Sequence, residues 1–284
     1  MSREPEVSSV WAAPIAIRRR FDLWRLGGRR VRHGWTSYDD LTESLAERGV
    51  RITPYRIDVD EFWRYVDTKG YRGMDYWHGG RMRAATEKWL EHFVSIDLLR
   101  PAAGEVLVDI ASCSSVFPDI LRDSWGCEAY RQDWSYPEGL QGDRLGGDAA
   151  ELALPDGFAD LLTLHCSFEH FEGDRDWRFL REAERVLRPG GRLCILPLYT
   201  NRRYSIQTDL EAWSARHPSF ERDAVICLAD RWGEVHGRFY DIEHFADRIL
   251  GNLGGLELEL FAVENYLEVA EDCYLKFAAV FTRR

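Results

Sequence analysis

Residues 159–198 read ADLLTLHCSFEHFEGDRDWRFLREAERVLRPGGRLCILPL, and this stretch decides the fold. Its first apolar run, Ala159–Cys166, predicts a buried strand, and Trp177–Leu187 predicts a helix. The tight turn Arg188-Pro-Gly-Gly191 then leads into a second apolar strand, Arg192–Leu198. Because a helix separates the two strands, we expect them to pair in parallel through a right-handed crossover.

The same alternation extends to both sides of this stretch. Glu105–Ile110 and Cys127–Gln132 predict strands, with a helix over Phe117–Trp125 between them. The chain closes with two strands, Leu256–Val263 and Tyr274–Thr282, which only a short polar bend separates, so they should pair antiparallel. The pattern predicts an α/β fold, a doubly wound Rossmann-like seven-stranded sheet with a C-terminal antiparallel strand.

The region before residue 101 carries helical patterns and no repeated strand signals. We therefore expect a mainly helical extension over 1–100, the sheet domain over 101–284, and a substrate-side insertion over 201–241. Within the extension, aromatic residues and glycines alternate between Tyr65 and Gly80. They indicate either a lid over the site or a simple cover for the core. The predicted helices of this region are Ser37–Glu47, Val59–Tyr65 and Arg83–Leu99.

The composition limits the class of protein. The chain is 45% hydrophobic, enough to fill a core, and no apolar run approaches the roughly 20 residues of a membrane helix. A net charge of −11 argues against a broad nucleic-acid surface. The seven arginines between Arg18 and Arg32 are either a solvated basic face or a docking patch for an anion. Six scattered cysteines without a C-x-x-C pair favour reduced thiols in the cytoplasm, without a metal site.

Polar residues follow the predicted strands where each strand should end. In open α/β sheets, ligands bind beyond the carboxyl ends of the strands. Asp109, Asp133, Asp148 and His165 all stand at such ends. Asp133 follows Asp109 at a spacing suited to an acid that accepts hydrogen bonds from ribose hydroxyls. We therefore expect a nucleotide-like ligand at this edge of the sheet.

Three motifs make the chain resemble a known family. The run Gly147–Asp160, the triplet Phe168-Glu-His170 and the run Phe179–Leu193 resemble class I S-adenosylmethionine-dependent methyltransferases, of the methyltransferase type 11 kind. The resemblance covers residues 99–198 well and implies S-adenosyl-L-methionine as the cofactor. It also implies roles for single residues. Asp109 would orient the cofactor loop and amino group, Asp133 would bind the ribose, Trp134 would flank the adenine, Asp148 with Ala149 would read the adenine edge, and His165 with Cys166 would face the methionine moiety.

The loop after the first strand departs from the family pattern. The family has glycine at every second position after the acid, whereas this chain has Ala111, Cys113 and Ser115 there. Glycine allows unusual backbone dihedrals and a close approach to the ligand. We expect a rebuilt loop that still binds the cofactor through Ala111, Ser112 and Cys113. A dinucleotide-dependent oxidoreductase does not fit, because no G-x-G-x-x-G follows the first strand.

The expected activity is O-methylation of a small molecule or glycan, with nitrogen as a second kind of acceptor atom. An oxygen acceptor benefits from a general base, and histidine suits neutral pH. The candidates for that role are His170, His236 and His165. The altered loop leaves another class open, a methyltransferase-like scaffold or regulatory partner without catalysis. An RNA methyltransferase rests on the arginine cluster alone, and a homo-oligomer stays open.

Overall fold

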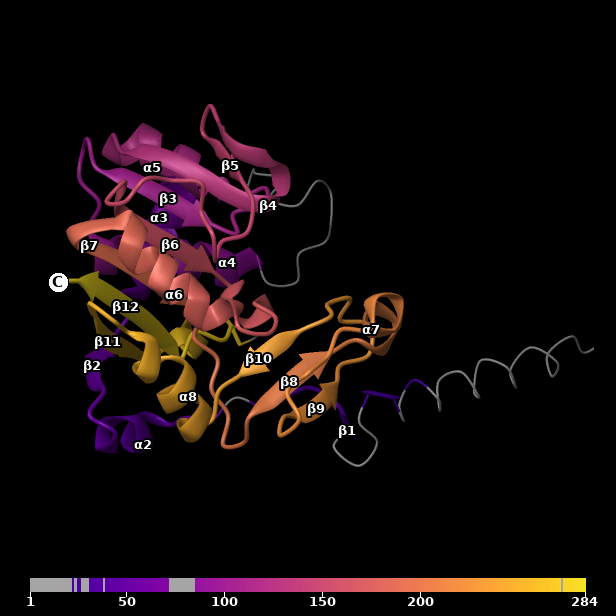
Figure 1. Cartoon of the computed structure of the whole chain (residues 1–284). Coiled ribbons are helices and arrows are strands. Elements are labelled where there is room, and N and C mark those ends of the chain that lie inside the picture. The colour runs from indigo at the N-terminus through magenta and orange to yellow at the C-terminus, as the bar shows by residue number, and fades with distance from the viewer. Residues whose placement is uncertain (1–21, 23–24, 27–30, 38, 72–84, 272) are drawn as a thin grey trace, which may run out of the picture.

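The computed structural model describes residues 22, 25–26, 31–37, 39–71, 85–271 and 273–284 (Figure 1). Its main element is an eight-stranded sheet. In spatial order the strands are β2 (Arg51–Tyr55), β11 (Leu256–Val263), β12 (Phe277–Arg283), β7 (Leu187–Leu196), β6 (Ala159–His165), β3 (Val106–Ile110), β4 (Glu128–Gln141) and β5 (Arg144–Gly146).

The strand pairing confirms the predicted doubly wound fold. β3 pairs in parallel with both β4 and β6, and β6 pairs in parallel with β7. β12 runs antiparallel to β7 and to β11, as the closing strand pair predicts. The strand order reverses direction between β3 and β6, so the loops that follow these two strands meet at the switch point. β2 adds an eighth strand at the edge, in parallel with β11.

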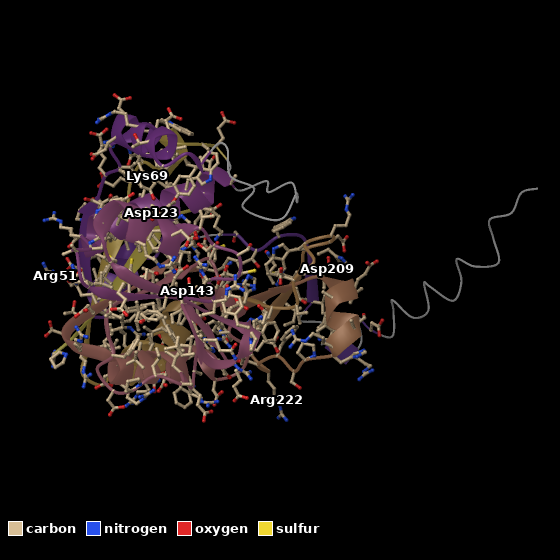
Figure 2. All side chains as sticks on the ribbon, turned by 90° about the horizontal axis from the view of Figure 1, so that it is seen from above. Arg51, Lys69, Asp123, Asp143, Asp209 and Arg222 are labelled. Atoms are coloured by element: carbon tan, nitrogen blue, oxygen red, sulfur yellow. The ribbon has the colours of Figure 1, made fainter. Side chains whose placement is uncertain are left out.

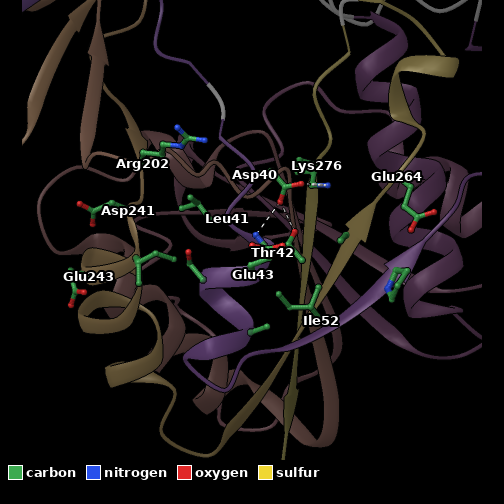
Figure 3. A pocket seen from close by; sticks show the side chains of 15 residues that line it. Asp40, Leu41, Thr42, Glu43, Ile52, Arg202, Asp241, Glu243, Glu264 and Lys276 are labelled. Atoms are coloured by element: carbon green, nitrogen blue, oxygen red, sulfur yellow. Dashed lines mark hydrogen bonds and ion pairs between the residues drawn. The ribbon is translucent and has the colours of Figure 1, made fainter.

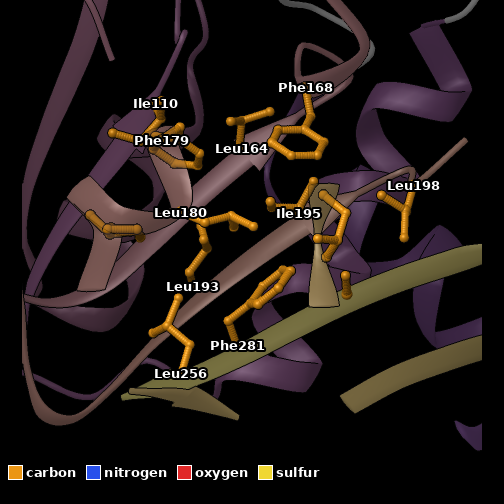
Figure 4. Packing of buried hydrophobic residues seen from close by; sticks show 14 of the residues in the cluster. Ile110, Leu164, Phe168, Phe179, Leu180, Leu193, Ile195, Leu198, Leu256 and Phe281 are labelled. Carbon is orange, nitrogen blue, oxygen red and sulfur yellow. The ribbon is translucent and has the colours of Figure 1, made fainter. Parts of the chain in front are cut away.

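Helices cover both faces of the sheet because successive strand residues point to opposite sides. Val106 and Val108 belong to one apolar cluster, to which α6 (Arg175–Val186), α8 (Ile242–Arg248) and α2 (Thr42–Glu47) also contribute. Leu107 belongs to the cluster on the other face, to which α3 (Val59–Thr68), α4 (Ala85–Leu99) and α5 (Phe117–Trp125) contribute. In the first cluster, Phe179 and Leu180 of α6 lie over Leu193 and Phe281 of the sheet (Figure 4).

A smaller four-stranded sheet projects from the main body (Figure 1). Its order is β1 (Val31–His33), β9 (Val225–Leu228), β8 (Ser205–Thr208) and β10 (Gly237–Phe239), and α7 (Leu210–Arg216) follows β8. The region 201–241, whose sequence is irregular, therefore forms a sheet with its own apolar cluster. The region before residue 101 is less helical than expected, because it supplies both β1 and β2. The basic cluster between Arg18 and Arg32 lies largely outside the described residues.

Charged side chains surround the body, and Asp209 lies in the projecting part, away from Lys69 and Asp123 (Figure 2). None of the helices that the structure describes is both long and apolar enough to cross a membrane.

Candidate active site

The loop after β3 keeps left-handed backbone angles at two of its non-glycine positions. Ala111 has a φ of 52° and Cys113 a φ of 47°. These are two of the positions where the family pattern has glycine. The backbone there has angles that glycine adopts without strain. For a residue with a Cβ, such angles cost about 1–3 kcal/mol each unless the surroundings hold them. Neighbouring side chains supply that support.

Asp109 links the loop after β3 to the adjacent strand β6 through hydrogen bonds. Its side chain is buried, and its carboxylate accepts hydrogen bonds from Ser112 Oγ at 2.7 Å, Thr163 Oγ1 at 2.8 Å and His165 Nδ1 at 3.1 Å. The other ring nitrogen of His165 lies 3.1 Å from Ser95 Oγ on α4. Both nitrogens of His165 are thus engaged inside the protein, and this arrangement suits a framework residue better than a general base.

Gln132, at the end of the predicted second strand, holds the loop from the side. Its Oε1 accepts a hydrogen bond from the Ala111 amide at 3.1 Å, and its backbone carbonyl accepts one from the Ser112 amide at 2.8 Å. Its Nε2 donates to the Gly147 carbonyl at 2.7 Å. Gln132 therefore joins the loop to the segment that contains Asp148. No sequence pattern predicts this role, because a single glutamine at a strand end belongs to no motif.

Asp133 faces the tip of the same loop. It is buried, and its Oδ2 accepts a hydrogen bond from the Cys113 amide at 2.9 Å. Its Oδ1 accepts two more, from the amide and the hydroxyl of Ser135, at 2.8 Å and 2.6 Å. The Tyr136 hydroxyl donates to the Cys113 carbonyl, so residues 135 and 136 are tied to the loop. Trp134, between them, is 78% exposed.

Asp148 and Ala149 lie in the segment that Gln132 reaches. Asp148 accepts hydrogen bonds from the Ala150 amide and from Arg175 Nε, both at 2.9 Å. Partial burial alone would raise the pKa of Asp148, but these two donors bring it below its ordinary value. Ala149 is buried. Asp148 is therefore an ionised hydrogen-bond acceptor in the segment that Gln132 joins to the loop after β3.

A cavity of about 60 Å³ brings together five of the predicted site residues, Asp109, Ala111, Ser112, Cys113 and His165. The lining does not include the predicted residues Asp133, Trp134, Asp148, Ala149, His170 and His236. Its lining comes from the loop after β3, the end of β6 and one side chain of α4: Lys88, Asp109, Ile110, Ala111, Ser112, Cys113, Ser115, His165, Cys166 and Ser167. The volume equals that of about two water molecules in the liquid. A larger ligand would need the surrounding segments to move apart.

The amino-terminal half of α4 adds buried charges beside this cavity. Lys88 Nζ donates to both oxygens of Glu91, at 3.1 Å and 2.8 Å. Burial first, and then the repulsion of Glu91, raise the pKa of Glu87 to about 8. Burial also raises the pKa of Glu91, against the attraction of Lys88. His92 packs against Phe117 with its rings 4.5 Å apart, so it belongs to the core rather than to the cavity.

The segments that contain His170 and His236 are joined by two hydrogen bonds from histidine rings to backbone carbonyls. His170 Nδ1 donates to the His236 carbonyl at 2.5 Å, and His236 Nδ1 donates to the Glu169 carbonyl at 2.8 Å. His236 is buried, and burial lowers the pKa of its ring well below the ordinary value. Its Nε2 has no hydrogen-bond partner among the described residues. His170 is partly exposed, and its Nε2 lies 3.6 Å from Glu169 Oε1.

The aromatic stretch before α4 is described in part. The hydroxyls of Tyr65 and Tyr71 lie 2.8 Å apart, and Tyr71 also contacts His92 Nδ1. Both tyrosines pack on α4, as a cover for the core would. Tyr76, Trp77 and His78, which the lid hypothesis also includes, lie outside the described residues.

A second, wider groove of about 1010 Å³ lies at the edge of the sheet that β2 forms. It is bounded by α2, β2, β11 and the start of α8 (Figure 3). Asp40 pairs there with Lys276 at 2.9 Å and accepts a hydrogen bond from the Thr42 amide. Glu243 pairs with Arg48, and its side chain is 70% exposed. The acidic groups described here are solvated or paired, and the groove is remote from the loop after β3.

A model of the family described as "Methyltransferase domain" matches residues 135–195. That stretch contains β6, α6 and most of β7, which flank the switch point described above. Residues 135–195 therefore match a methyltransferase domain. The resemblance to this family implies S-adenosylmethionine as the cofactor.

Three solved structures show what the methyltransferase domain is similar to. One is 1,6-didemethyltoxoflavin-N1-methyltransferase of Burkholderia thailandensis with 1,6-didemethyltoxoflavin and S-adenosylhomocysteine, at 13% identity and a TM-score of 0.49, over 81% of this chain and 92% of that one. The PH0226 protein of Pyrococcus horikoshii has 18% identity and a TM-score of 0.47, over 76% and 99%. An S-adenosylmethionine-dependent methyltransferase of Mesorhizobium loti has 16% identity and a TM-score of 0.44, over 68% and 98%. No curated protein matches the chain.

The donor set of the methyltransferase domain fits its cofactor. S-adenosylmethionine presents ribose hydroxyls and a methionyl end that carries both an ammonium and a carboxylate. Asp133 would be the acceptor for the hydroxyls, and a carboxylate with three hydrogen bonds still has room for about one more. Lys88 lines the cavity beside the loop and suits the methionyl carboxylate. The cofactor would replace internal bonds of Asp133, above all those from Ser135.

Proposed function

We propose that this chain transfers the methyl group of S-adenosylmethionine to a nucleophile of a small molecule or glycan. One observation carries the proposal. Asp109, near the end of β3, and Asp133, just beyond the part of β4 that pairs with β3, hold a loop that keeps left-handed angles at Ala111 and Cys113. A loop that had lost its ligand would gain stability by relaxing these angles. When bound, the cofactor supplies a methyl group on a positively charged sulfur.

In this proposal each part of the site has a separate task. Asp133 holds the ribose, Asp148 and Ala149 read the adenine edge, and Trp134 covers the adenine. Lys88 and the loop residues Ala111, Ser112 and Cys113 hold the methionyl end. The acceptor atom gains one bond to carbon as the sulfur–carbon bond breaks, and it loses one proton. His170 is the candidate that takes this proton to solvent, because its Nε2 carries the free lone pair and the side chain is partly exposed. His236 is less suited because it is buried.

Transfer of a labelled methyl group tests the activity. The purified protein is incubated with S-adenosylmethionine labelled in its methyl group and with a metabolite extract, and the small-molecule and glycan fractions are counted. We expect label in one of these fractions, and its loss in Asp133→Ala. Asp123→Asn, an exposed acid on α5, is the matched control and should transfer normally. Absence of both label and cofactor binding would contradict the proposal.

A non-catalytic scaffold is the second candidate, and a specific observation favours it. Both oxygens of Asp133 are already satisfied inside the protein, and the adjoining cavity is small. A scaffold would keep this closed arrangement in the presence of the cofactor. Protection of the Cys113 and Ser135 amides from hydrogen exchange separates the two functions, because cofactor binding changes it only if Asp133 exchanges its partners.

A further inference from the structure

Three buried carboxylates gather where α4 meets the turn after β6. Glu91 is fully buried, and Glu87 and Glu169 are at most 9% exposed. Glu169 acts electrostatically on both Glu87 and Glu91, which places the three groups close to one another. In the part of the chain that the structure describes, Lys88 is the cation paired with this carboxylate cluster, through its bond to Glu91. Burial raises the pKa of Glu87 to about 8 and also raises that of Glu91, so a proton on these acids and a cation bound beside them are alternative ways to offset the cost of burying their charge.

Glu169 points to a ligand independently of this charge count. Its Oε1 lies 3.3 Å from Cys166 Sγ and 3.6 Å from His170 Nε2. Its Oε2 is buried and has no hydrogen-bond partner among the described residues. A buried carboxylate oxygen without a donor costs about 1–3 kcal/mol or more, so buried polar atoms nearly always have partners. A donor from outside the chain would remove this cost.

Aromatic rings stand next to the carboxylate cluster. The Tyr199 hydroxyl lies 3.4 Å from Cys166 Sγ, the same sulfur that contacts Glu169. The Tyr199 ring stacks on Tyr274 with centroids 5.4 Å apart and lies 5.3 Å from Phe239. Aromatic faces combined with carboxylates attract organic cations through the ring quadrupole and through charge. Oxygen nucleophiles such as neutral alcohols gain much less from this combination.

The carboxylate cluster also adjoins the loop that would hold the cofactor. Cys166 and Lys88 both line the cavity beside residues 109–115, and both contact the cluster, Cys166 through Glu169 and Lys88 through Glu91. A group bound to the cluster therefore lies beside the methionyl end of the cofactor.

We propose that the methyl acceptor is an arylalkyl amine, whose ammonium group binds in the carboxylate cluster and donates a hydrogen bond to Glu169 Oε2. This proposal rests on the proposed function. The ammonium must lose one proton before its nitrogen carries a lone pair, and Glu169 accepts that proton. His170, whose Nε2 faces the other oxygen of Glu169, then takes the proton towards solvent. Tyr199, Phe239 and Tyr274 contact the apolar part of the amine.

Matched amines and alcohols test the proposal by binding alone. The probes are phenethylamine against 2-phenylethanol, and tyramine against 4-(2-hydroxyethyl)phenol, titrated by calorimetry with and without S-adenosylhomocysteine. We expect each amine to bind at least tenfold more tightly than its alcohol, because hydrogen bonds to charged groups contribute about 1.5–3 kcal/mol. Equal affinities within both pairs, or no binding of either amine, would overturn the proposal.

Two variants test whether the preference for amines depends on Glu169. Glu169→Gln should weaken amine binding about tenfold or more and leave alcohol binding unchanged, with its fold checked by circular dichroism. Glu172→Gln lies three residues away, pairs with Arg216 and should bind as the wild type does. An amine preference that survives in Glu169→Gln would also overturn the proposal. S-adenosylhomocysteine binding is read separately, so its loss contradicts the proposed function and not the amine preference.

Discussion

Ala111 and Cys113 hold backbone angles that glycine adopts without strain. Replacing Ala111 with glycine should therefore raise the free energy of unfolding by about 0.5–1 kcal/mol, because the strain removed exceeds the extra entropy of the unfolded chain. Ala46→Gly, on the exposed face of α2, should lower it by about 1 kcal/mol. Urea unfolding of both variants measures the difference. A loss in Ala111→Gly as large as in Ala46→Gly would show that the loop is unstrained.

Glu87 makes stability depend on pH. Its pKa rises from an ordinary value of 4.5 to about 8 in the folded protein, chiefly through burial. Between these values the folded state keeps a proton that the unfolded state has released, so the free energy of unfolding falls as pH rises. The fall from about pH 5 to about pH 8 should be on the order of a few kcal/mol, at about 1.4 kcal/mol per pKa unit. Glu87→Gln should flatten this slope and Glu172→Gln should not. Identical slopes in the wild type and Glu87→Gln would refute the assignment.

Single residues differ in how far the sequence predicts them. Asp109 and His165 stand at the ends of β3 and β6 because an apolar run followed by a polar residue marks such an end. Asp133 lies inside β4, just beyond the part of β4 that pairs with β3. Their roles towards the cofactor stay predictions. Glu87 and Glu91 were missed because two glutamates four residues apart beside a lysine are typical of a solvated helix face. Both lie near Glu169 in the turn after β6, and Glu87 also accepts a hydrogen bond from the backbone of Tyr274, before β12, which no local pattern reveals.

The strand β4 differs most from its predicted form. The sequence predicts its end at Gln132, yet the extended chain continues to Gln141 and pairs with β5 at Gly146. Ser135 and Tyr136 consequently lie against the loop after β3 rather than in a free connection. Other elements match closely, since α5 and β11 have the predicted bounds. Both have strong periodicity and clear ends, whereas residues 133–141 have neither.

We expect the extension of β4 to influence the affinity for the cofactor through Ser135. Ser135→Ala removes one of the three hydrogen bonds to Asp133, so the ribose would compete with one donor fewer. A net hydrogen bond contributes about 1 kcal/mol, and S-adenosylhomocysteine should bind roughly fivefold more tightly to the variant. Ser124→Ala, at the end of α5, serves as the control. Weaker binding in Ser135→Ala would mean that the serine contacts the cofactor itself.

At the scale of the whole molecule, the sequence predicts the central strands of the main sheet. It does not predict β1, β2 or the smaller sheet. Alternating strands and helices identify the core because each crossover is local in sequence. β1 pairs with β9 and β2 with β11, across about 200 residues, and both β1 and β2 are short. Such pairings depend on contacts between distant segments, which periodicity cannot register. Three strands of the smaller sheet, β8, β9 and β10, lie close together in the sequence but have only three or four residues each, which is too short for a clear periodicity.

Calorimetric titration of S-adenosylmethionine and S-adenosylhomocysteine tests most directly whether the rebuilt loop still binds the cofactor. The wild type, Asp133→Ala and the control Asp123→Asn are titrated under the same conditions. We predict that both ligands bind the wild type and the control, and that Asp133→Ala weakens both by about tenfold or more, as loss of a charged acceptor should. No binding of either ligand to the wild type, or equal binding to Asp133→Ala, would contradict the account.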